Sequence, residues 1–163
     1  MENKDWVMEA ENGILCALLL NNDAYDKIGS FLRPEHFSTI FGSVVYKTIS
    51  ESLNAGGSCD VITVYESITR KTPDLGISLE DLANVASGSS MGAMIVRYAE
   101  SLVEAYKEKK LLEAIHKAYE EASDQSLPVE DRVARVAMLI DSASQGHQAG
   151  KDPTLIGELI PEY

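Results

Sequence analysis

The chain is organised around residues 93–144, AMIVRYAESLVEAYKEKKLLEAIHKAYEEASDQSLPVEDRVARVAMLIDSAS, a stretch that contains no glycine. Glycine is otherwise scattered between Gly13 and Gly92, and it returns at Gly146. Within the stretch, Pro128 is the one residue that breaks helices. The sequence therefore predicts two long helices, over 93–123 and 128–144, which a short turn folds back as an antiparallel hairpin.

Apolar side chains recur every three or four residues along both predicted helices. The two helices can cover only part of these stripes by packing on each other. The rest must contact the remainder of the chain or a second copy, and the length of the hairpin favours a second copy. We expect some members to seal the hairpin and others to pair protomers, in a predicted pairing set of Tyr98, Leu102, Leu112, Ile115, Tyr119, Val133, Val136 and Ile140.

The first 90 residues predict a head of shorter helices with recognisable end signals. Asn22 or Asp23 could cap one helix, and Ser78 begins another with Asp81 three residues later, as in a capping box. The predicted helical ranges are 8–21, 24–31, 40–53, 61–69 and a short one from 78.

The range 61–69 is the ambiguous one, because its first four residues, VITV, are β-branched and could form a strand. Helix is favoured because Ile62, Tyr65 and Ile68 are three residues apart and Asp60 can cap them. No segment alternates apolar and polar residues between turn glycines. The predicted fold class is therefore all-α, with a globular head of short helices and a long C-terminal hairpin.

Composition restricts the function. The chain has 163 residues, 45% of them hydrophobic and 25% charged, as in a soluble globular protein. Its 14 Lys and Arg against 26 Asp and Glu give a net charge of −12, which argues against a direct nucleic-acid grip and fits a protein-binding module. The longest apolar run, 14–20, is far shorter than the roughly 20 residues that cross a membrane, and no signal peptide is recognisable. We expect a cytoplasmic protein with no membrane partner.

Motifs of catalysis are missing from the sequence. There is no GxxxxGK[ST] phosphate loop and no GxGxxG, and His36, His116 and His147 lack metal-ligand spacing. Two cysteines make neither a disulfide framework nor a four-ligand zinc site. The residues alone thus predict a helical interaction module with no catalytic residue, no metal and no cofactor, rather than an enzyme.

A polar linker follows the hairpin. Residues 145–152, QGHQAGKD, are rich in polar side chains and glycine, and apolar residues with helical spacing come after Pro153. We expect this tail to dock on a partner or neighbouring subunit, or to be the start of a longer segment, with packing on the head as the remaining alternative. The apolar residues that would make the contact are Leu155, Ile156, Leu159 and Ile160. The predicted organisation is a head over 1–90, a hairpin over 91–144, and a linker with the start of a linker helix over 145–163.

Five segments, in order, resemble the N-terminal domain of bacterial replicative DNA helicases of the DnaB type. The resemblance runs from about Ala10 to Ser144. No single motif is specific, but five in the same order over this length are. The segments are AENGILCALL at 10–19, LRPEHF at 32–37, GGSCDVITV at 56–64, LEDLA at 79–83, and YAE at 98–100 followed by Val103, Leu111 and Leu112.

The resemblance implies a partner set. In this family, hairpins pair two protomers, and three pairs form a collar above the ATPase ring. The collar receives primase and can contact a helicase loader, while the linker helix packs on a neighbouring subunit. The chain is thus expected to act in DNA replication by self-association and partner docking, and to meet DNA only through the full-length assembly.

Two departures leave alternatives open. Cys16 stands where the family motif has glycine, and residues 87–94 differ from the usual sequence, which indicates a divergent member. The ATPase domain, which would bind ATP and Mg²⁺ and make the full-length protein a helicase, does not follow within this sequence. The chain is then either a helicase fragment or a natural stand-alone relative, and in the second case it could regulate or inhibit a host helicase by mimicry.

Overall fold

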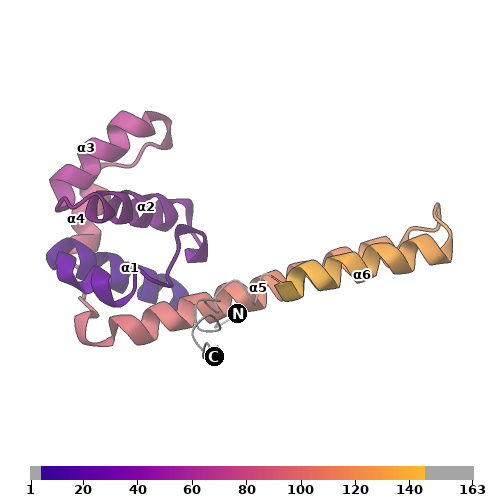
Figure 1. Cartoon of the computed structure of the whole chain (residues 1–163). Coiled ribbons are helices and arrows are strands. Elements are labelled where there is room, and N and C mark those ends of the chain that lie inside the picture. The colour runs from indigo at the N-terminus through magenta and orange to yellow at the C-terminus, as the bar shows by residue number, and fades with distance from the viewer. Residues whose placement is uncertain (1–4, 146–163) are drawn as a thin grey trace, which may run out of the picture. The chain divides into compact units, whose positions relative to one another are not determined.

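The structure is a computed structural model, and it describes residues 5–145. Throughout that range the regular elements are helical and no strand is formed, which confirms the all-α prediction (Figure 1). The α-helices are α1 Asp5–Leu20, α2 Ile40–Asn54, α3 Val61–Lys71, α4 Leu79–Ala86, α5 Ile95–Ser123 and α6 Val129–Gln145. Short 3₁₀ helices form at η1 Asn22–Lys27, η2 Pro34–His36, η3 Pro73–Leu75 and η4 Gly92–Met94.

The chain divides into two compact units between Tyr106 and Lys107, inside α5. The head therefore includes the first three turns of α5, whereas the sequence placed its end at residue 90. Its core joins α1, α2 and these first turns, and α3 and α4 each add apolar side chains. The largest fully buried side chains include Ile14, Leu15, Leu18, Tyr46, Ile49, Ile68, Leu82, Ile95 and Leu102.

Side-chain caps fix where the head helices begin. The Asp60 carboxylate accepts a hydrogen bond from the Thr63 N–H (2.8 Å), and this bond holds the pKa of Asp60 below its ordinary value. Ser78 and Asp81 form a capping box, in which the Asp81 N–H donates to the Ser78 hydroxyl oxygen (3.1 Å). Both predicted caps are confirmed, and 61–71 is a helix rather than a strand.

The predicted helix over 24–31 is wrong. The structure has the 3₁₀ helix η1 there, capped by Asn21 rather than by Asn22 or Asp23. Asn22 instead bonds to a distant segment: its amide donates to the Cys59 carbonyl (2.9 Å), and its oxygen accepts from the Cys59 N–H (3.0 Å). That tertiary use of Asn22 leaves the preceding asparagine to cap, and sequence pattern alone does not reveal such a pairing.

One buried carboxylate joins α1 to α2. Glu11 is 2% exposed, and its carboxylate accepts a hydrogen bond from the backbone N–H of Ser38, just before α2. Burial raises the pKa of Glu11, and the hydrogen bonds from Ser38 and Thr39 only partly offset this. Tyr46 secures the same region, because its hydroxyl donates to the Leu32 carbonyl (3.0 Å) and its ring stacks on Phe37 (4.9 Å between centroids).

Glu11→Gln is expected to change how stability depends on pH. Between the ordinary pKa of 4.5 and the raised value, the folded chain binds more protons at Glu11 than the unfolded chain does. The contribution of Glu11 to the free energy of unfolding therefore falls as pH rises through that window. Glutamine does not ionise, so urea unfolding from pH 4.5 upward should show a flatter decline for the variant.

The control is Glu9→Gln on the exposed side of the same helix, which should keep the wild-type pH dependence. Glu11→Ala leaves the Ser38 N–H without its acceptor and should cost about 1–3 kcal/mol at pH 4.5, where the contribution of Glu11 has not yet declined. Identical pH profiles for Glu11→Gln and the wild type would contradict this account.

Candidate protein-interaction site

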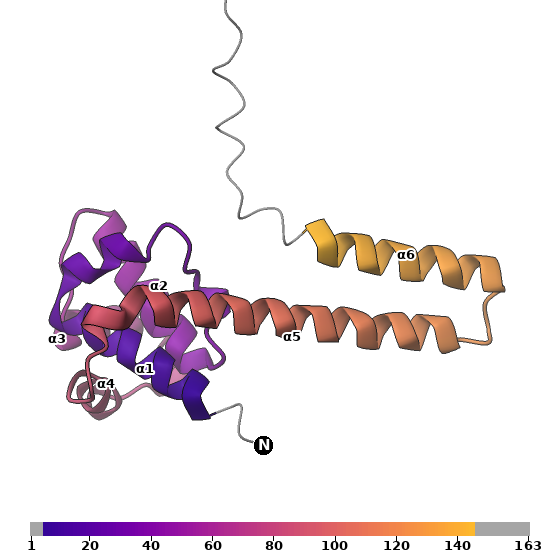
Figure 2. The same ribbon diagram turned by 90° about the horizontal axis from the view of Figure 1, so that it is seen from below.

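The hairpin unit is closed by polar contacts at its turn. Figure 2 shows α5 and α6 running side by side in opposite directions, as predicted. In the turn, the Asp124 carboxylate accepts hydrogen bonds from the Ser126 hydroxyl (2.6 Å) and N–H (3.0 Å), which lower the pKa of Asp124. Between the helices, Arg132 donates to the Ala122 carbonyl (3.0 Å), and Arg135 pairs with Glu121 (3.2 Å).

Alanines on α5 and aliphatic side chains on α6 are the better covered apolar positions of the hairpin. Ala114 and Ala118 are the more buried apolar positions on the hairpin part of α5, and Ala118 is the best covered. On α6 the partly buried positions 136, 139 and 143 are three or four residues apart and hold Val136, Leu139 and Ala143. The partial burial of Val136 fits the sealing role, one of the two roles that the sequence left open.

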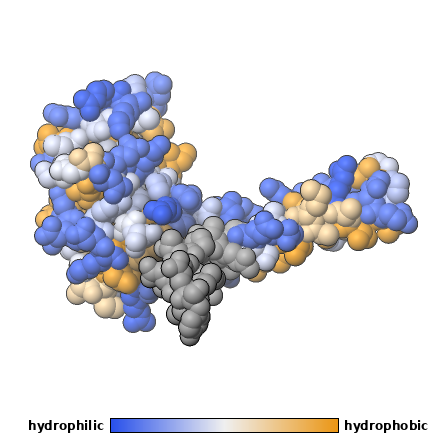
Figure 3. Space-filling view, viewed as in Figure 1, coloured by the Kyte–Doolittle hydropathy of each residue, from blue (hydrophilic) through white to orange (hydrophobic). Residues whose placement is uncertain are grey.

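A second apolar stripe on each helix stays exposed. On α5 it contains Leu112, Ile115 and Tyr119, and Tyr119 is 72% exposed. On α6 it contains Val133, which is 63% exposed, and Ile140. Figure 3 shows apolar surface among the polar atoms of the two helices.

The two exposed stripes lie on one side of the hairpin. Ile115 is three residues before the sealing Ala118, and Val133 is three residues before the sealing Val136, so each stripe is rotated from the helix contact in the same sense. Two antiparallel helices are related by a two-fold axis perpendicular to the plane that contains them. This rotation keeps each flank of the hairpin on its own side, so stripes with the same offset from the contact lie on the same flank. We call Leu112, Ile115, Tyr119, Val133 and Ile140 the hairpin face.

The remaining predicted pairing residues belong to the head. Leu102 is fully buried and packs with Ile95 and Ala99 in the head core, so it is not available to another protomer. Tyr98 is partly buried against the same core. The apolar stripe that the sequence predicts along all of α5 thus has two parts. The part up to Tyr106 belongs to the head, where Ile95 and Leu102 are buried, and the part beyond it, with Ile115, is exposed among the described residues.

Two exposed apolar residues of α6 were missing from the predicted set. Val129 is four residues before Val133 and extends the hairpin face by one turn. Its membership of the periodic stripe was the signal that could have identified it. Met138 is 72% exposed, but it is two residues from both Val136 and Ile140 and so lies on a different side of the helix.

Over residues 5–145, no three His, Cys, Asp or Glu side chains are grouped in a way that could hold a metal ion. In that same part of the chain, no helix is long and apolar enough to cross a membrane. The predicted docking tail, Leu155, Ile156, Leu159 and Ile160, lies outside the described residues.

Comparisons with known proteins agree on one family. The family model described as DnaB-like helicase N terminal domain matches residues 3–104. The replicative DNA helicases DnaB of Buchnera aphidicola (24% identical, 94% of this chain) and Rickettsia conorii (27%, 95%) are similar in sequence. This chain covers 34% and 32% of those two proteins, about a third of their length.

Two solved structures share the fold. The N-terminal domain of DnaB helicase from Mycobacterium tuberculosis has a TM-score of 0.72 at 23% identity, over 83% of this chain and 96% of that one. A DnaB-like replicative helicase, whose structure is described together with its interactions with primase, has a TM-score of 0.62 at 19% identity, over 90% of this chain and 36% of that one. The predicted family resemblance is confirmed.

Val136→Asp and Val133→Asp should separate sealing from exposed positions. The Val136 side chain is partly buried in the helix contact, so a carboxylate there loses apolar packing and is desolvated, at a cost of about 1–3 kcal/mol. Val133 is exposed, and its replacement should change the free energy of unfolding of the monomer by less than about 0.5 kcal/mol.

The measurement is thermal unfolding followed by helical circular dichroism at low protein concentration, where association contributes least. Equal destabilisation by the two variants would show that the sealing and exposed positions are assigned wrongly.

Proposed function

Because the chain belongs to the family of DnaB-like helicase N-terminal domains, we propose that it serves a replicative DNA helicase as an assembly and docking domain. In this proposal the hairpin faces of two copies pack together, and such pairs close into a collar. The collar then offers a docking surface to primase or to a helicase loader. Helicase activity, with its ATP and Mg²⁺, would reside in a separate ATPase domain of the full-length protein.

The observation that carries the proposal is the hairpin face. Five apolar side chains, including Tyr119 and Leu112, lie on one flank of a two-helix unit too thin to bury them. Grouped exposed apolar residues mark protein contacts far more often than isolated ones do. A symmetric pair covers the same face on both copies at once, so self-association removes the whole exposed stripe from water.

The charged side chains of α5 also support a contact made through its apolar stripe. Lys110 pairs with Glu113 (2.8 Å between Nζ and Oε2), and His116 lies 3.5 Å from Glu120. By helical spacing Lys110, Glu113 and Glu120 lie away from the stripe of Leu112, Ile115 and Tyr119, whereas His116, four residues after Leu112, borders it. One flank of α5 is therefore charged and internally paired, while the other is apolar, as a helix at a protein–protein contact requires.

The docking of primase is the second part of the proposal. A DnaB-like helicase with a similar fold has been described in its interactions with primase. Calorimetric titration of the whole chain with the primase of the same organism should give saturable binding. Absence of binding would contradict primase docking and leave self-association to be judged by its own test.

Leu112→Asp should convert a dimer or larger assembly into a monomer. The substitution places a charge in the middle of the hairpin face, where pairing would remove it from water. Light scattering on a sizing column reads the mass, and circular dichroism should show unchanged helicity, since Leu112 is exposed in the single chain.

Met138→Asp is the control, because Met138 is also exposed (72%, against 60% for Leu112) but lies on another side of α6. It should leave the assembly intact. A wild-type chain that stays monomeric at high concentration, or a Leu112→Asp variant that assembles like the wild type, would overturn the pairing.

A further inference from the structure

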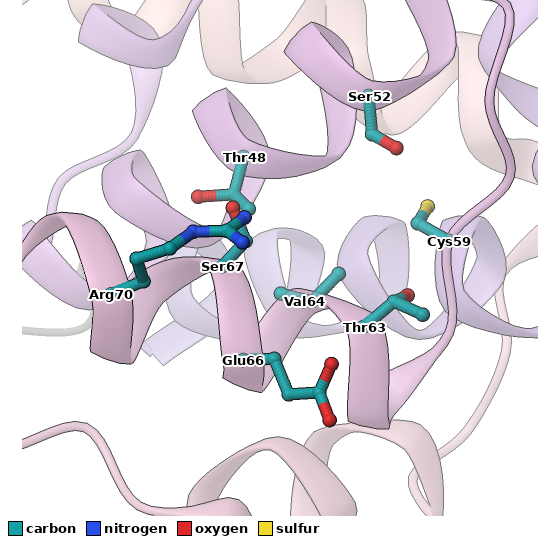
Figure 4. Close-up of a pocket in the computed structure, with 8 residues that line it drawn as sticks. All are labelled: Thr48, Ser52, Cys59, Thr63, Val64, Glu66, Ser67 and Arg70. Atoms are coloured by element: carbon teal, nitrogen blue, oxygen red, sulfur yellow. The ribbon is translucent and has the colours of Figure 1, made fainter.

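A small polar pocket opens between α2 and α3 in the head, well apart in sequence from the hairpin face. Its volume is about 260 Å³. Figure 4 shows its lining, which combines four hydroxyl groups with one cationic and one anionic side chain. The lining residues are Thr48, Ser52, Cys59, Thr63, Val64, Glu66, Ser67 and Arg70.

The cation in this lining is not neutralised. Within residues 5–145, the Arg70 guanidinium has neither an ion pair nor a hydrogen bond. Its neighbour Lys71 is satisfied by Glu51, at 2.7 Å. Glu66, one turn before Arg70, points its carboxylate away from the guanidinium (Figure 4). Residues 1–106 contain seven Lys or Arg and fifteen Asp or Glu, so this cation belongs to a head that is acidic as a whole.

One of the four pocket hydroxyls remains available beside Arg70, and the Ser52 hydroxyl is not that one, because it donates to the Ser58 carbonyl (3.4 Å). The hydroxyls of Thr48 and Thr63 are used inside the chain, since they donate to the Val44 and Asp60 carbonyls. The Ser67 hydroxyl, one turn of helix from Arg70 on α3, makes no hydrogen bond among the described residues. A guanidinium fork with a neighbouring hydroxyl is a donor set suited to an oxygen anion.

Size and charge restrict the ligand. Pockets for drug-sized ligands are about 300–1,000 Å³, so this one takes a single small group rather than a nucleotide. The surrounding acidic head repels a dianion more strongly than a monoanion. A carboxylate attached to a basic peptide satisfies both conditions, because the basic residues around it are attracted to the head.

We propose that this pocket receives one carboxylate, the side chain of an Asp or Glu in a basic segment of a docked protein, through Arg70 and Ser67. The proposal rests on the protein-docking function above and names a contact for it on the head. It requires no second copy of the chain. Loss of self-association would therefore leave carboxylate binding in place.

Nuclear magnetic resonance of the whole chain tests the pocket. The probe is the peptide acetyl-Lys-Glu-Lys-amide, and the matched probe is acetyl-Lys-Gln-Lys-amide, both titrated at constant ionic strength set with chloride. The carboxylate peptide should give saturable shifts in the backbone amides of 48–70 and bind at least fivefold tighter than its glutamine counterpart. Equal affinity for the two peptides would overturn the proposal.

Arg70→Gln should remove the preference for the carboxylate peptide, while Lys71→Gln, with the same loss of charge at the next residue, should keep it. A preference that survives Arg70→Gln would also overturn the proposal. Inorganic phosphate is titrated in parallel: binding tighter than that of the carboxylate peptide would reassign the pocket to a free anion and reject a protein ligand. Light scattering on the same samples reports self-association independently.

Discussion

The constraint on which the structure depends is that the apolar stripe of α5 is longer than the head that covers it. Ile95, Ala99 and Leu102 are buried in the head core, but the stripe continues past Tyr106 into a unit of only two helices. Two helices can bury one side of each other and no more. Whatever lies on the adjacent flank, here Ile115 and its neighbours, stays in water until another molecule covers it.

The head core holds the first part of the α5 stripe in place. Helix α1 is nearly surrounded by other elements, and its buried Glu11 bonds to the backbone that leads into α2, so the two helices keep a fixed relation. A carboxylate in that place costs desolvation that an apolar residue would not. In return, the carboxylate makes a directional hydrogen bond. It accepts from the Ser38 N–H just before α2, and the Thr39 side chain caps the first turn of that helix.

Local signals predicted the helices, and tertiary contacts explain the failures. Asp60 and Ser78 could be identified as caps because each bonds within three residues of itself. Asn22 could not be interpreted correctly, because its partner, Cys59, is 37 residues away. The same holds for the candidate site: periodicity found the stripes, but only burial separates Leu102 and Val136 from Ile115 and Val133.

Cys16, the residue of α1 that departs from the family motif, lies against the end of α4 and the loop that follows it. At Cys16, where the motif has glycine, the thiol sulfur lies 3.5 Å from the carbonyl oxygens of both Ala86 and Gly88, so it contacts the end of α4 and the following loop. Gly13 has no such room, since a Cβ there would approach the Met91 side chain to 2.4 Å. Both positions of α1 face residues 86–91: position 16 has room for a thiol, whereas a side chain at position 13 would require the Met91 side chain to move.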